Sequence, residues 1–186
     1  SDKLTHFLRY KNDSLMISCK TLNKDNPKLN CRLKGLDKFS PKRIILDNNL
    51  KIKTNSYIFK TATNENTIIF YKNATKKKVI FFKKKNIKLI KSNLNKSGNF
   101  DLKLILKKLY YLGCRNLLVE GGNDLTCSFL KNKLFNQFYL FKSLKNLSKL
   151  TDHKDFNSFK YLSQNYKNKL KINIKLSKDL ITLYKK

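Results

Sequence analysis

The sequence predicts an α/β fold with a sheet of mixed strand direction and an antiparallel hairpin near the end of the chain. Three observations favour this fold. Short apolar runs alternate with segments of helical periodicity, apolar and polar residues alternate near the end, and no Pro- or Gly-rich linker interrupts the 186 residues. A chain of this length fits one hydrophobic core, so we expect residues 1–186 to form a single domain.

The spacing of apolar residues predicts three helices. Asp2–Tyr10 places its apolar residues on one face. Asp101–Gly113 begins with a capping aspartate, carries a stripe of leucine and isoleucine, and ends at a glycine. Asn123–Asn132 follows a Gly-Gly turn.

Short apolar runs predict the buried strands of the sheet. The polar segment Thr21–Arg32, which contains Pro27, is predicted to be a loop. The predicted strands are Ser14–Cys19, Arg43–Asp47, Thr67–Tyr71, Val79–Phe82, Ile87–Ile90, Asn116–Glu120 and Gln137–Phe141.

The end of the chain predicts a hairpin. Leu170, Ile172, Ile174 and Leu176 alternate with lysine and asparagine, which is typical of a strand with one solvent-exposed face. Leu180–Tyr184 follows a short polar break, and we expect it to pair with that strand.

The formal net charge of +30 would attract nucleic acid, anionic lipid or phosphorylated ligands. Only four of the 42 basic residues are arginine, however: Arg9, Arg32, Arg43 and Arg115. Arginine is the better residue for bidentate recognition of phosphates and base edges, so a protein that reads nucleic acid would use more of it. Because Lys, Asn, Ile, Phe and Tyr are all enriched, as in AT-rich genes, we interpret most of the charge as lysine on solvated faces.

The cysteines and histidines do not predict a metal site. The four cysteines, at positions 19, 31, 114 and 127, form no C-x-x-C pair, and His6 and His153 lie far from them in sequence. A disulfide framework is not expected in a chain of this length. No apolar run is long enough to span a membrane and no signal-peptide core is present, so we expect a soluble, cytoplasmic protein.

The most specific local feature is LLVEGGNDLTCS, Leu117–Ser128. A strand that ends in Glu-Gly-Gly before a helix presents free backbone N–H groups and the positive end of the helix dipole to a phosphate. Glycine lets the phosphate approach the backbone closely. The motif is not G-x-G-x-x-G, so it does not predict a Rossmann fold, and an ordinary tight turn also explains it.

Arg9 and Arg32 stand out in a chain so rich in lysine, which suggests a bidentate phosphate partner. A surface ion pair is the alternative for either residue. Asp25 lies in the same polar segment as Thr21, where it is either a turn-capping residue or a functional carboxylate.

Read in order, THFLR, DSLMISCKTLNKDNPKLNCR, SPKRIILD and LLVEGGNDLTCSFL resemble the reductase domain of the bifunctional riboflavin-biosynthesis deaminase–reductase, the 5-amino-6-(5-phosphoribosylamino)uracil reductase family. That family reads H-x-L-R, T-x-x-x-D-x-P-x-L-x-x-R, R-I-V-L-D and V-E-G-G, and the match runs from Asp2 to about Phe141. The resemblance implies a three-layer fold similar to dihydrofolate reductase, with helices on both faces of a mixed sheet, and a homodimer. It also implies that NADPH reduces the ribosyl group of the substrate to the ribitylamino phosphate.

The resemblance carries site residues over position by position. Arg9, Leu29, Arg32 and Glu120 match substrate-binding positions, and the two guanidinium groups suit the 5′-phosphate. Asp25 is the candidate catalytic group, which would steer a proton to the ring oxygen as the ring opens. The positions that match cofactor contacts are Thr21, Asp25, Asn48, Gly122, Asn123, Asp124, Leu125, Thr126, Cys127 and Ser128.

The chain departs from the family pattern in three places. Asn123-Asp124 replaces Pro or Ser followed by Thr, and an inward carboxylate there would repel a cofactor phosphate. The family's Pro and Gly are missing from Lys142–Lys149. The family's first strand, with its Lys and Ser-x-Trp contacts, is expected upstream of Ser1, in a longer chain that begins with a zinc deaminase domain.

Two other functions stay open on the sequence. The departures also fit a reductase-like domain that has lost catalysis and serves dimerisation or scaffolding. The run Lys76–Asn86 (KKKVIFFKKKN) fits nucleic-acid binding if Phe81 or Phe82 stacks on bases, although a strand would place these residues in the core.

Overall fold

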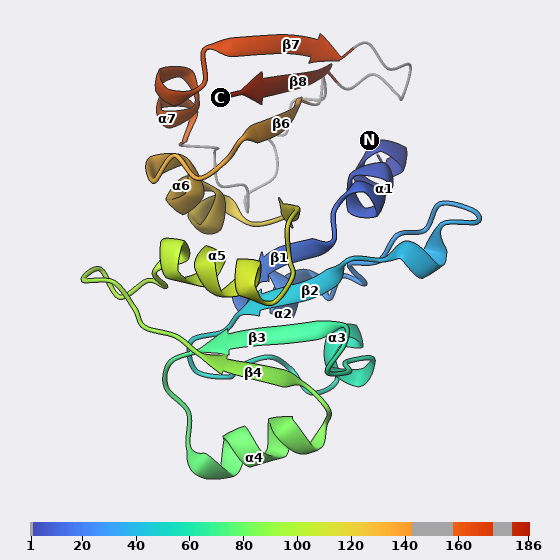
Figure 1. The fold of residues 1–186 in the computed structure, drawn as a ribbon, viewed down its shortest axis with the longest axis vertical. Helices are drawn as coiled ribbons and strands as arrows, with labels where there is room; N and C mark the ends of the chain where they lie inside the picture. The colour runs from blue at the N-terminus through green and yellow to red at the C-terminus, as the bar shows by residue number, and fades with distance from the viewer. Residues whose placement is uncertain (1, 143–157, 173–179) are drawn as a thin grey trace, which may run out of the picture. The chain divides into compact units, whose positions relative to one another are not determined.

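The computed structural model describes residues 2–142, 158–172 and 180–186. The chain divides into two compact units, one of residues 5–121 and one of residues 2–4 with the described residues after 121. Each unit is described by itself, and Figure 1 labels the elements of both. Every helix within the described ranges is too short or too polar to cross a lipid bilayer.

The first unit is built on a five-stranded parallel sheet of order β4-β3-β2-β1-β5 (Figure 1). Met16 of β1, which lies between β2 and β5, pairs with Ile44 on one side and Val119 on the other. Helical crossovers return the chain to the same end of the sheet each time, which makes every pairing parallel. The strands are β1 (Ser14–Ser18), β2 (Lys42–Leu46), β3 (Thr67–Tyr71), β4 (Lys88–Lys91) and β5 (Leu117–Val119).

Short polar side chains begin four helices of this unit. Ser18, Ser56, Thr75 and Asp101 each accept a backbone N–H of the first turn, as N-cap residues do. The helices are α1 (Asp2–Lys11), of which residues 5–11 belong to this unit, α2 (Cys19–Asp25), the 3-10 helix η1 (Asp37–Phe39), α3 (Tyr57–Lys60), α4 (Lys76–Lys84) and α5 (Leu102–Tyr111).

Helices cover both faces of the parallel sheet. Side chains alternate along a strand, so Leu15 and Ile17 share one face, where they pack in a single core with residues of α2, α3 and α4. The crossover from β4 to β5 runs back along the sheet, and a right-handed connection in that direction places α5 on the other face. There α5 buries Leu102, Ile105 and Leu109.

The second unit contains a three-stranded antiparallel sheet of order β6-β8-β7. Its core gathers Leu130, Leu162, Tyr166 and Tyr184. The elements are α6 (Asn123–Lys131), β6 (Gln137–Lys142), α7 (Phe159–Asn165), β7 (Asn168–Ile172) and β8 (Leu180–Lys185).

The predicted α/β class and the terminal hairpin are confirmed, because β7 and β8 pair antiparallel. The two strand directions occur in separate sheets, parallel in the first unit and antiparallel in the second. All three predicted helices are present. Ile174 and Leu176, predicted to extend the hairpin strand, and nearly all of Lys142–Lys149 lie outside the described residues.

Two local predictions were wrong. Val79–Phe82 is not a strand but the middle of α4, which Thr75 caps and in which Phe82 is buried against Phe59. A short apolar run fits a buried strand and a helix equally well, and here the flanking lysines continue the helix. Thr21–Arg32 is not all loop, because α2 runs to Asp25 and ends where Asn26 adopts the left-handed conformation.

Candidate functional site

Arg9 and Glu120 form a bidentate ion pair across 111 residues of sequence. Arg9 Nε donates to Glu120 Oε1 and Nη2 donates to Oε2, both at 2.7 Å. The two side chains are only 10% and 24% exposed, so solvent screens the pair weakly. Glu120 directly follows β5, and its backbone N–H donates to Met16 O at 3.0 Å, which fixes the carboxylate at the end of the strand.

Asn30 joins Arg9 to Arg32. Its backbone carbonyl accepts from Arg9 Nη1 at 3.1 Å, and its side-chain oxygen accepts from Arg32 Nη1 at 3.2 Å. The backbone N–H of Arg32 donates to His6 Nδ1 at 3.3 Å. We call His6, Arg9, Asn30, Arg32 and Glu120 the arginine cluster.

The arginine cluster lies at the carboxyl edge of the parallel sheet, where open α/β sheets bind their ligands. Arg9 is buried and Glu120 is partly buried, whereas the side chain of Arg32 is exposed. The cluster therefore presents one accessible guanidinium and one guanidinium held in place by a carboxylate.

Asn48 follows β2 at the same carboxyl edge and holds a buried acceptor. Its side-chain Oδ1 has no hydrogen-bond partner in the described part of the chain, while its backbone carbonyl accepts from the N–H groups of Lys72 and Asn73. A buried acceptor without a donor costs about 1–3 kcal/mol, so a ligand N–H group would be well matched to this oxygen.

Thr21 lies on the first turn of α2, immediately after β1. Its hydroxyl lies 2.9 Å from the Ser18 hydroxyl, and its backbone N–H donates to the same Ser18 oxygen at 3.2 Å. One hydrogen bond therefore joins the two hydroxyl groups at the end of β1, and each keeps capacity for a further partner.

Leu29 and Asp25 differ in the exposure of their side chains. The Leu29 side chain is 1% exposed and belongs to the core, while its backbone has φ 56°. Only the Leu29 backbone can therefore contact a ligand. Asp25 is exposed on the last turn of α2, and no hydrogen bond or ion pair among the described residues joins it to the arginine cluster.

The predicted cofactor positions from Gly122 to Ser128 form the start of α6, in the second unit. The helix begins after Gly122, which as a glycine has no side chain to cap it. Leu125 is buried, and the Ser128 hydroxyl donates to the Asp124 carbonyl at 2.9 Å. Gly122 has φ −66°, a value that any residue can adopt. Glycine is therefore not required here by backbone conformation, and its distinguishing property is its small size.

Arg43 and Arg115 hold structure together. Arg43 is buried and donates to Thr61 and Asn66, and burial lowers the pKa of its guanidinium. The Arg115 guanidinium lies 3.9 Å from the Tyr110 ring centroid. Of the four arginines, Arg9 and Arg32 are the two that converge at the sheet edge.

The cysteines are not poised for chemistry. Cys19, Cys31 and Cys114 are buried, and all four cysteines are free. Burial raises the pKa of the Cys19 thiol, and the carboxylate of Asp47 raises it further, which keeps the thiol protonated and unreactive. Within the described residues, no three His, Cys, Asp or Glu side chains gather as metal ligands would.

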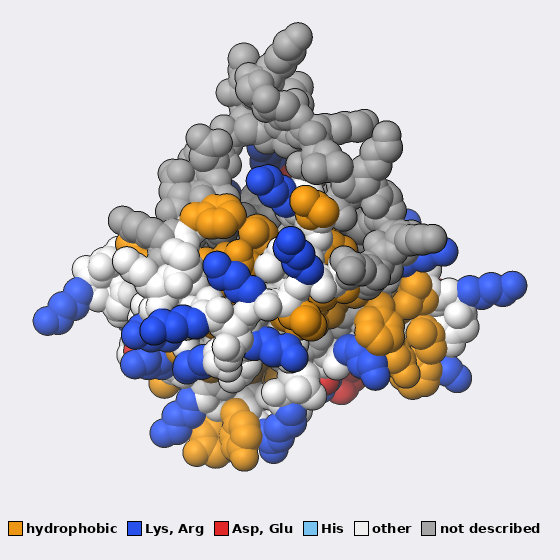
Figure 2. All heavy atoms as spheres, turned by 90° about the horizontal axis from the view of Figure 1, so that it is seen from above, with side chains coloured by type: hydrophobic (Ala, Val, Ile, Leu, Met, Phe, Trp, Pro, Cys, Tyr) orange, Lys and Arg blue, Asp and Glu red, His pale blue; other side chains and the backbone are white. Residues whose placement is uncertain are grey.

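Lysine and arginine side chains are spread over the face seen in Figure 2, with little acidic surface between them. In the lysine-rich run on α4, Phe82 is buried and the Phe81 ring stacks on Phe59 at 5.9 Å. One face of the Phe81 ring is therefore already covered. This packing weakens the case for base stacking on α4.

His6 and Asn30 were not predicted as site residues. His6 lies three residues before Arg9, on the same face of α1, which is the sequence signal that could have found it. No pattern in the sequence indicates Asn30, because its role depends on how the loop folds.

Comparisons with known proteins identify relatives. The family model for the RibD C-terminal domain matches residues 1–143. The riboflavin biosynthesis protein RibD of Aquifex aeolicus is 32% identical over 141 residues, which cover 76% of this chain and 37% of that protein. The 2,5-diamino-6-ribosylamino-4(3H)-pyrimidinone 5′-phosphate reductase of Debaryomyces hansenii is 32% identical over 139 residues, covering 66% of this chain and 56% of that protein.

A solved structure shares the fold. It is the diaminohydroxyphosphoribosylaminopyrimidine deaminase/5-amino-6-(5-phosphoribosylamino)uracil reductase of Thermotoga maritima, with a TM-score of 0.71 and 23% identity. The alignment covers 100% of this chain and 49% of that one. The chain therefore matches only part of each of these proteins: 37% of the Aquifex relative, 56% of the Debaryomyces relative and 49% of the Thermotoga chain.

Proposed function

Because the chain belongs to the RibD C-terminal domain family, we propose that it is an NADPH-dependent reductase of 5-amino-6-(5-phosphoribosylamino)uracil, which converts the ribosyl group to the ribitylamino phosphate. The observation that carries the proposal is the arginine cluster at the carboxyl edge of the parallel sheet. Two relatives with about the same identity carry names that place them in riboflavin biosynthesis or in reduction of a ribosylaminopyrimidine phosphate.

Arg32 and Arg9 have different tasks in this proposal. Arg32 is exposed and donates only one side-chain hydrogen bond among the described residues, so most of its N–H groups are available to the 5′-phosphate. Arg9 already donates to Glu120 and Asn30. It contributes positive charge in a fixed place and orients the carboxylate.

Glu120 would hold the sugar or the pyrimidine. An ionised carboxylate accepts about four hydrogen bonds, and Arg9 uses two of these positions. The remaining lone pairs can accept a ribose hydroxyl or a pyrimidine N–H. Leu29 would add only backbone contacts, since its side chain is in the core.

Asn48 and Thr21 of the first unit are the residues that would contact NADPH there, and residues 122–128 of the second unit are cofactor contacts implied by the family resemblance. The buried Oδ1 of Asn48 would accept a hydrogen bond from the carboxamide. NADPH supplies the hydride when bound. Asp25 is our candidate for steering a proton to the ring oxygen as the sugar opens, and its exposed carboxylate has access to water.

We also propose that the protein works as a homodimer with a deaminase that supplies its substrate. The name of the Thermotoga protein combines a deaminase and a reductase, and this chain aligns with 49% of that chain. A deaminase would produce the uracil-type ring that the proposed reduction takes as substrate.

The direct test is to follow NADPH absorbance in the presence of the natural full-length protein and enzymatically prepared substrate. We expect substrate-dependent oxidation of NADPH and saturable NADPH binding. Saturable binding without turnover would support the scaffold alternative instead, and absence of both would overturn the proposal.

A further inference from the structure

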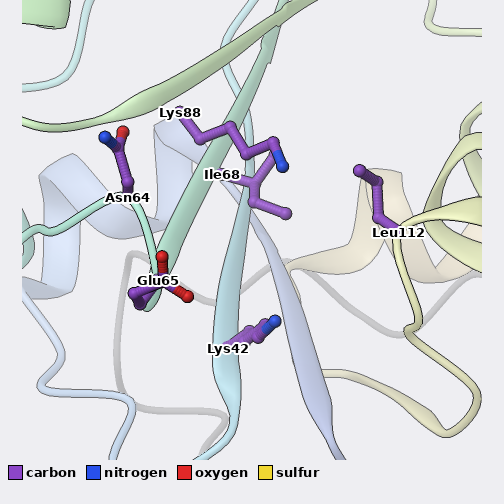
Figure 3. A pocket seen from close by; sticks show the side chains of 6 residues that line it. All are labelled: Lys42, Asn64, Glu65, Ile68, Lys88 and Leu112. Atoms are coloured by element: carbon purple, nitrogen blue, oxygen red, sulfur yellow. The ribbon is translucent and has the colours of Figure 1, made fainter.

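A second ligand site is suggested by a pocket of about 360 Å³ at the amino edge of the parallel sheet, opposite to the arginine cluster (Figure 3). Lys42 and Lys88 are the first residues of β2 and β4, and Asn64 and Glu65 precede β3. The lining residues are Lys42, Asn64, Glu65, Ile68, Lys88 and Leu112.

The strand register directs both lysines to the same face. Ile68 of β3 pairs with Ile44 and with Lys88, and Lys42 lies two residues before Ile44. Residues two apart on a strand share a face, so both lysines flank Ile68, with Cα atoms about 12 Å apart across two strand spacings and two residues along the strand. Figure 3 shows both side chains reaching over the strands toward the side on which Leu112 lies. Two long side chains at this spacing can reach one anion.

These charges have no partners within the part of the chain that the structure describes. Lys42, Lys88 and Glu65 form no ion pair there, and their side chains form no hydrogen bond. The lysines are not required as hydrogen-bond donors to the last carbonyl groups of α5, because the carbonyls of Leu109 and Tyr110 already accept backbone N–H groups. A structural role at the helix end therefore does not explain the pair.

The buried thiol of Cys114 feels the charge of both lysines. Burial raises the pKa of this thiol, a hydrogen bond with Ser14 opposes the rise, the carboxylate of Asp13 adds to it, and the ammonium groups of Lys42 and Lys88 oppose it. Both lysines are therefore close enough to act on the same side chain.

We propose that this pocket binds a small phosphorylated molecule that also carries an amino or hydroxyl group. The phosphate lies between Lys42 and Lys88, and the amino or hydroxyl group donates to Glu65. Ile68 and Leu112 form the apolar part of the wall. The pocket volume lies at the lower end of the range of about 300–1,000 Å³ for small-molecule sites. Because the site is at the opposite edge of the sheet, it binds independently of the proposed reductase site.

The test uses O-phosphoethanolamine, which carries a phosphate and an ammonium group, with inorganic phosphate as the comparison probe. Isothermal titration of the natural full-length protein at constant ionic strength should show saturable binding of O-phosphoethanolamine. The double variant Lys42→Gln/Lys88→Gln should bind it at least about tenfold more weakly, which is the loss of about 1.4 kcal/mol.

A matched control separates the pocket from the general positive field. Lys83→Gln/Lys84→Gln removes the same charge from exposed positions on α4 and should change affinity by less than about twofold, as expected for screened surface charges. Equal weakening by the two double variants, or no saturable binding by the parent protein, would overturn the site.

Glu65→Gln tests the second half of the proposal. It should remove the preference for O-phosphoethanolamine over inorganic phosphate while leaving phosphate binding intact or stronger, because a carboxylate repels phosphate. An unchanged preference would overturn the assignment of Glu65. These titrations require neither NADPH nor substrate, so their result is independent of the reductase proposal.

Discussion

His6 on α1 accepts a hydrogen bond from the backbone N–H of Arg32 through Nδ1 at 3.3 Å. The neutral imidazole with its proton on Nε2 makes this bond, and His6 is 8% exposed. The helix that carries Arg9 therefore also fixes the segment that carries the exposed Arg32 guanidinium.

We expect His6→Leu to raise the KM for the phosphorylated substrate by about five- to tenfold, with kcat changed less, because a hydrogen bond worth about 1 kcal/mol positions Arg32. His6→Asn should restore much of the affinity, since its Oδ1 lies near the place of Nδ1. Steady-state kinetics of both variants measures the effect. Equal KM values for the two variants would assign His6 to packing alone.

Breaking the Arg9–Glu120 pair should destabilise the protein. Glu120→Ala leaves the Arg9 guanidinium without its carboxylate, and we expect the free energy of unfolding to fall by about 2–4 kcal/mol. Arg9→Ala/Glu120→Ala should cost less than the sum of the single variants, because the second change removes the orphaned charge. Urea unfolding of the four proteins measures the coupling, and additive losses would show that the pair does not stabilise the fold.

Arg32 should matter for the substrate and not for stability. Arg32→Ala removes an exposed guanidinium, so we expect less than about 0.5 kcal/mol change in unfolding free energy. The KM should rise by about tenfold or more for the phosphorylated substrate and stay unchanged for its dephosphorylated form. Arg115→Ala, which removes an exposed arginine stacked on Tyr110, is the matched control. A similar rise in KM for both variants would indicate a loss of general positive charge.

Asn48→Leu should separate stability from cofactor binding. The substitution removes a buried oxygen without a partner, so the ligand-free protein should be as stable as the parent or more stable, by up to about 1 kcal/mol. NADPH should bind about tenfold more weakly, because the variant cannot accept a hydrogen bond from the carboxamide. Fluorescence titration with NADPH measures the affinity, and Asn49→Leu is the control. Undiminished NADPH affinity in Asn48→Leu would remove this residue from the proposed site.

Stability should fall in alkaline solution. The folded protein raises the pKa of the Cys19 thiol above its ordinary value of 9.0, through burial and the neighbouring Asp47. Below pH 9.0 the thiol is protonated in both states and the stabilisation is complete; above it only the unfolded chain ionises, so stability declines as pH rises. Cys19→Ala should show a shallower decline in urea midpoints between about pH 9 and 10.5. If the urea midpoints of variant and parent fall equally with pH, groups other than Cys19 cause the loss of stability in alkaline solution.

The sequence predicted correctly those helices and strands whose capping residues and apolar periodicity lie within the segment itself. Asp101 and Gly113 delimit a helix at both ends, and α5 is observed between them. The prediction of a strand within Lys76–Lys84 was wrong, because a run of four apolar residues is too short to show whether its period is that of a helix or a strand. Helix α2 was missed because its polar residues favour turns, while its start depends on the Ser18 cap.

In the candidate site, too, the sequence indicated individual residues but not the contacts between them. The sequence singled out Arg9, Arg32 and Glu120; in the structure Arg9 pairs directly with Glu120, and Asn30 joins Arg9 to Arg32. The bidentate pairing of Arg9 with Glu120 was not predictable, because it depends on β5 lying beside β1. Nor did the sequence show that the Leu29 side chain would enter the core, since a leucine at a left-handed φ gives no local signal.

The strand order has a consequence for synthesis on the ribosome. The last strand of the parallel sheet lies beside the first, so the guanidinium of Arg9 leaves the exit tunnel long before its carboxylate partner is made. At about 5–20 residues per second, the delay between the two residues is about 5–20 s. During that interval one edge of β1 lacks its neighbour β5. This unpaired edge can pair with another polypeptide unless a chaperone covers it or β5 is synthesised first.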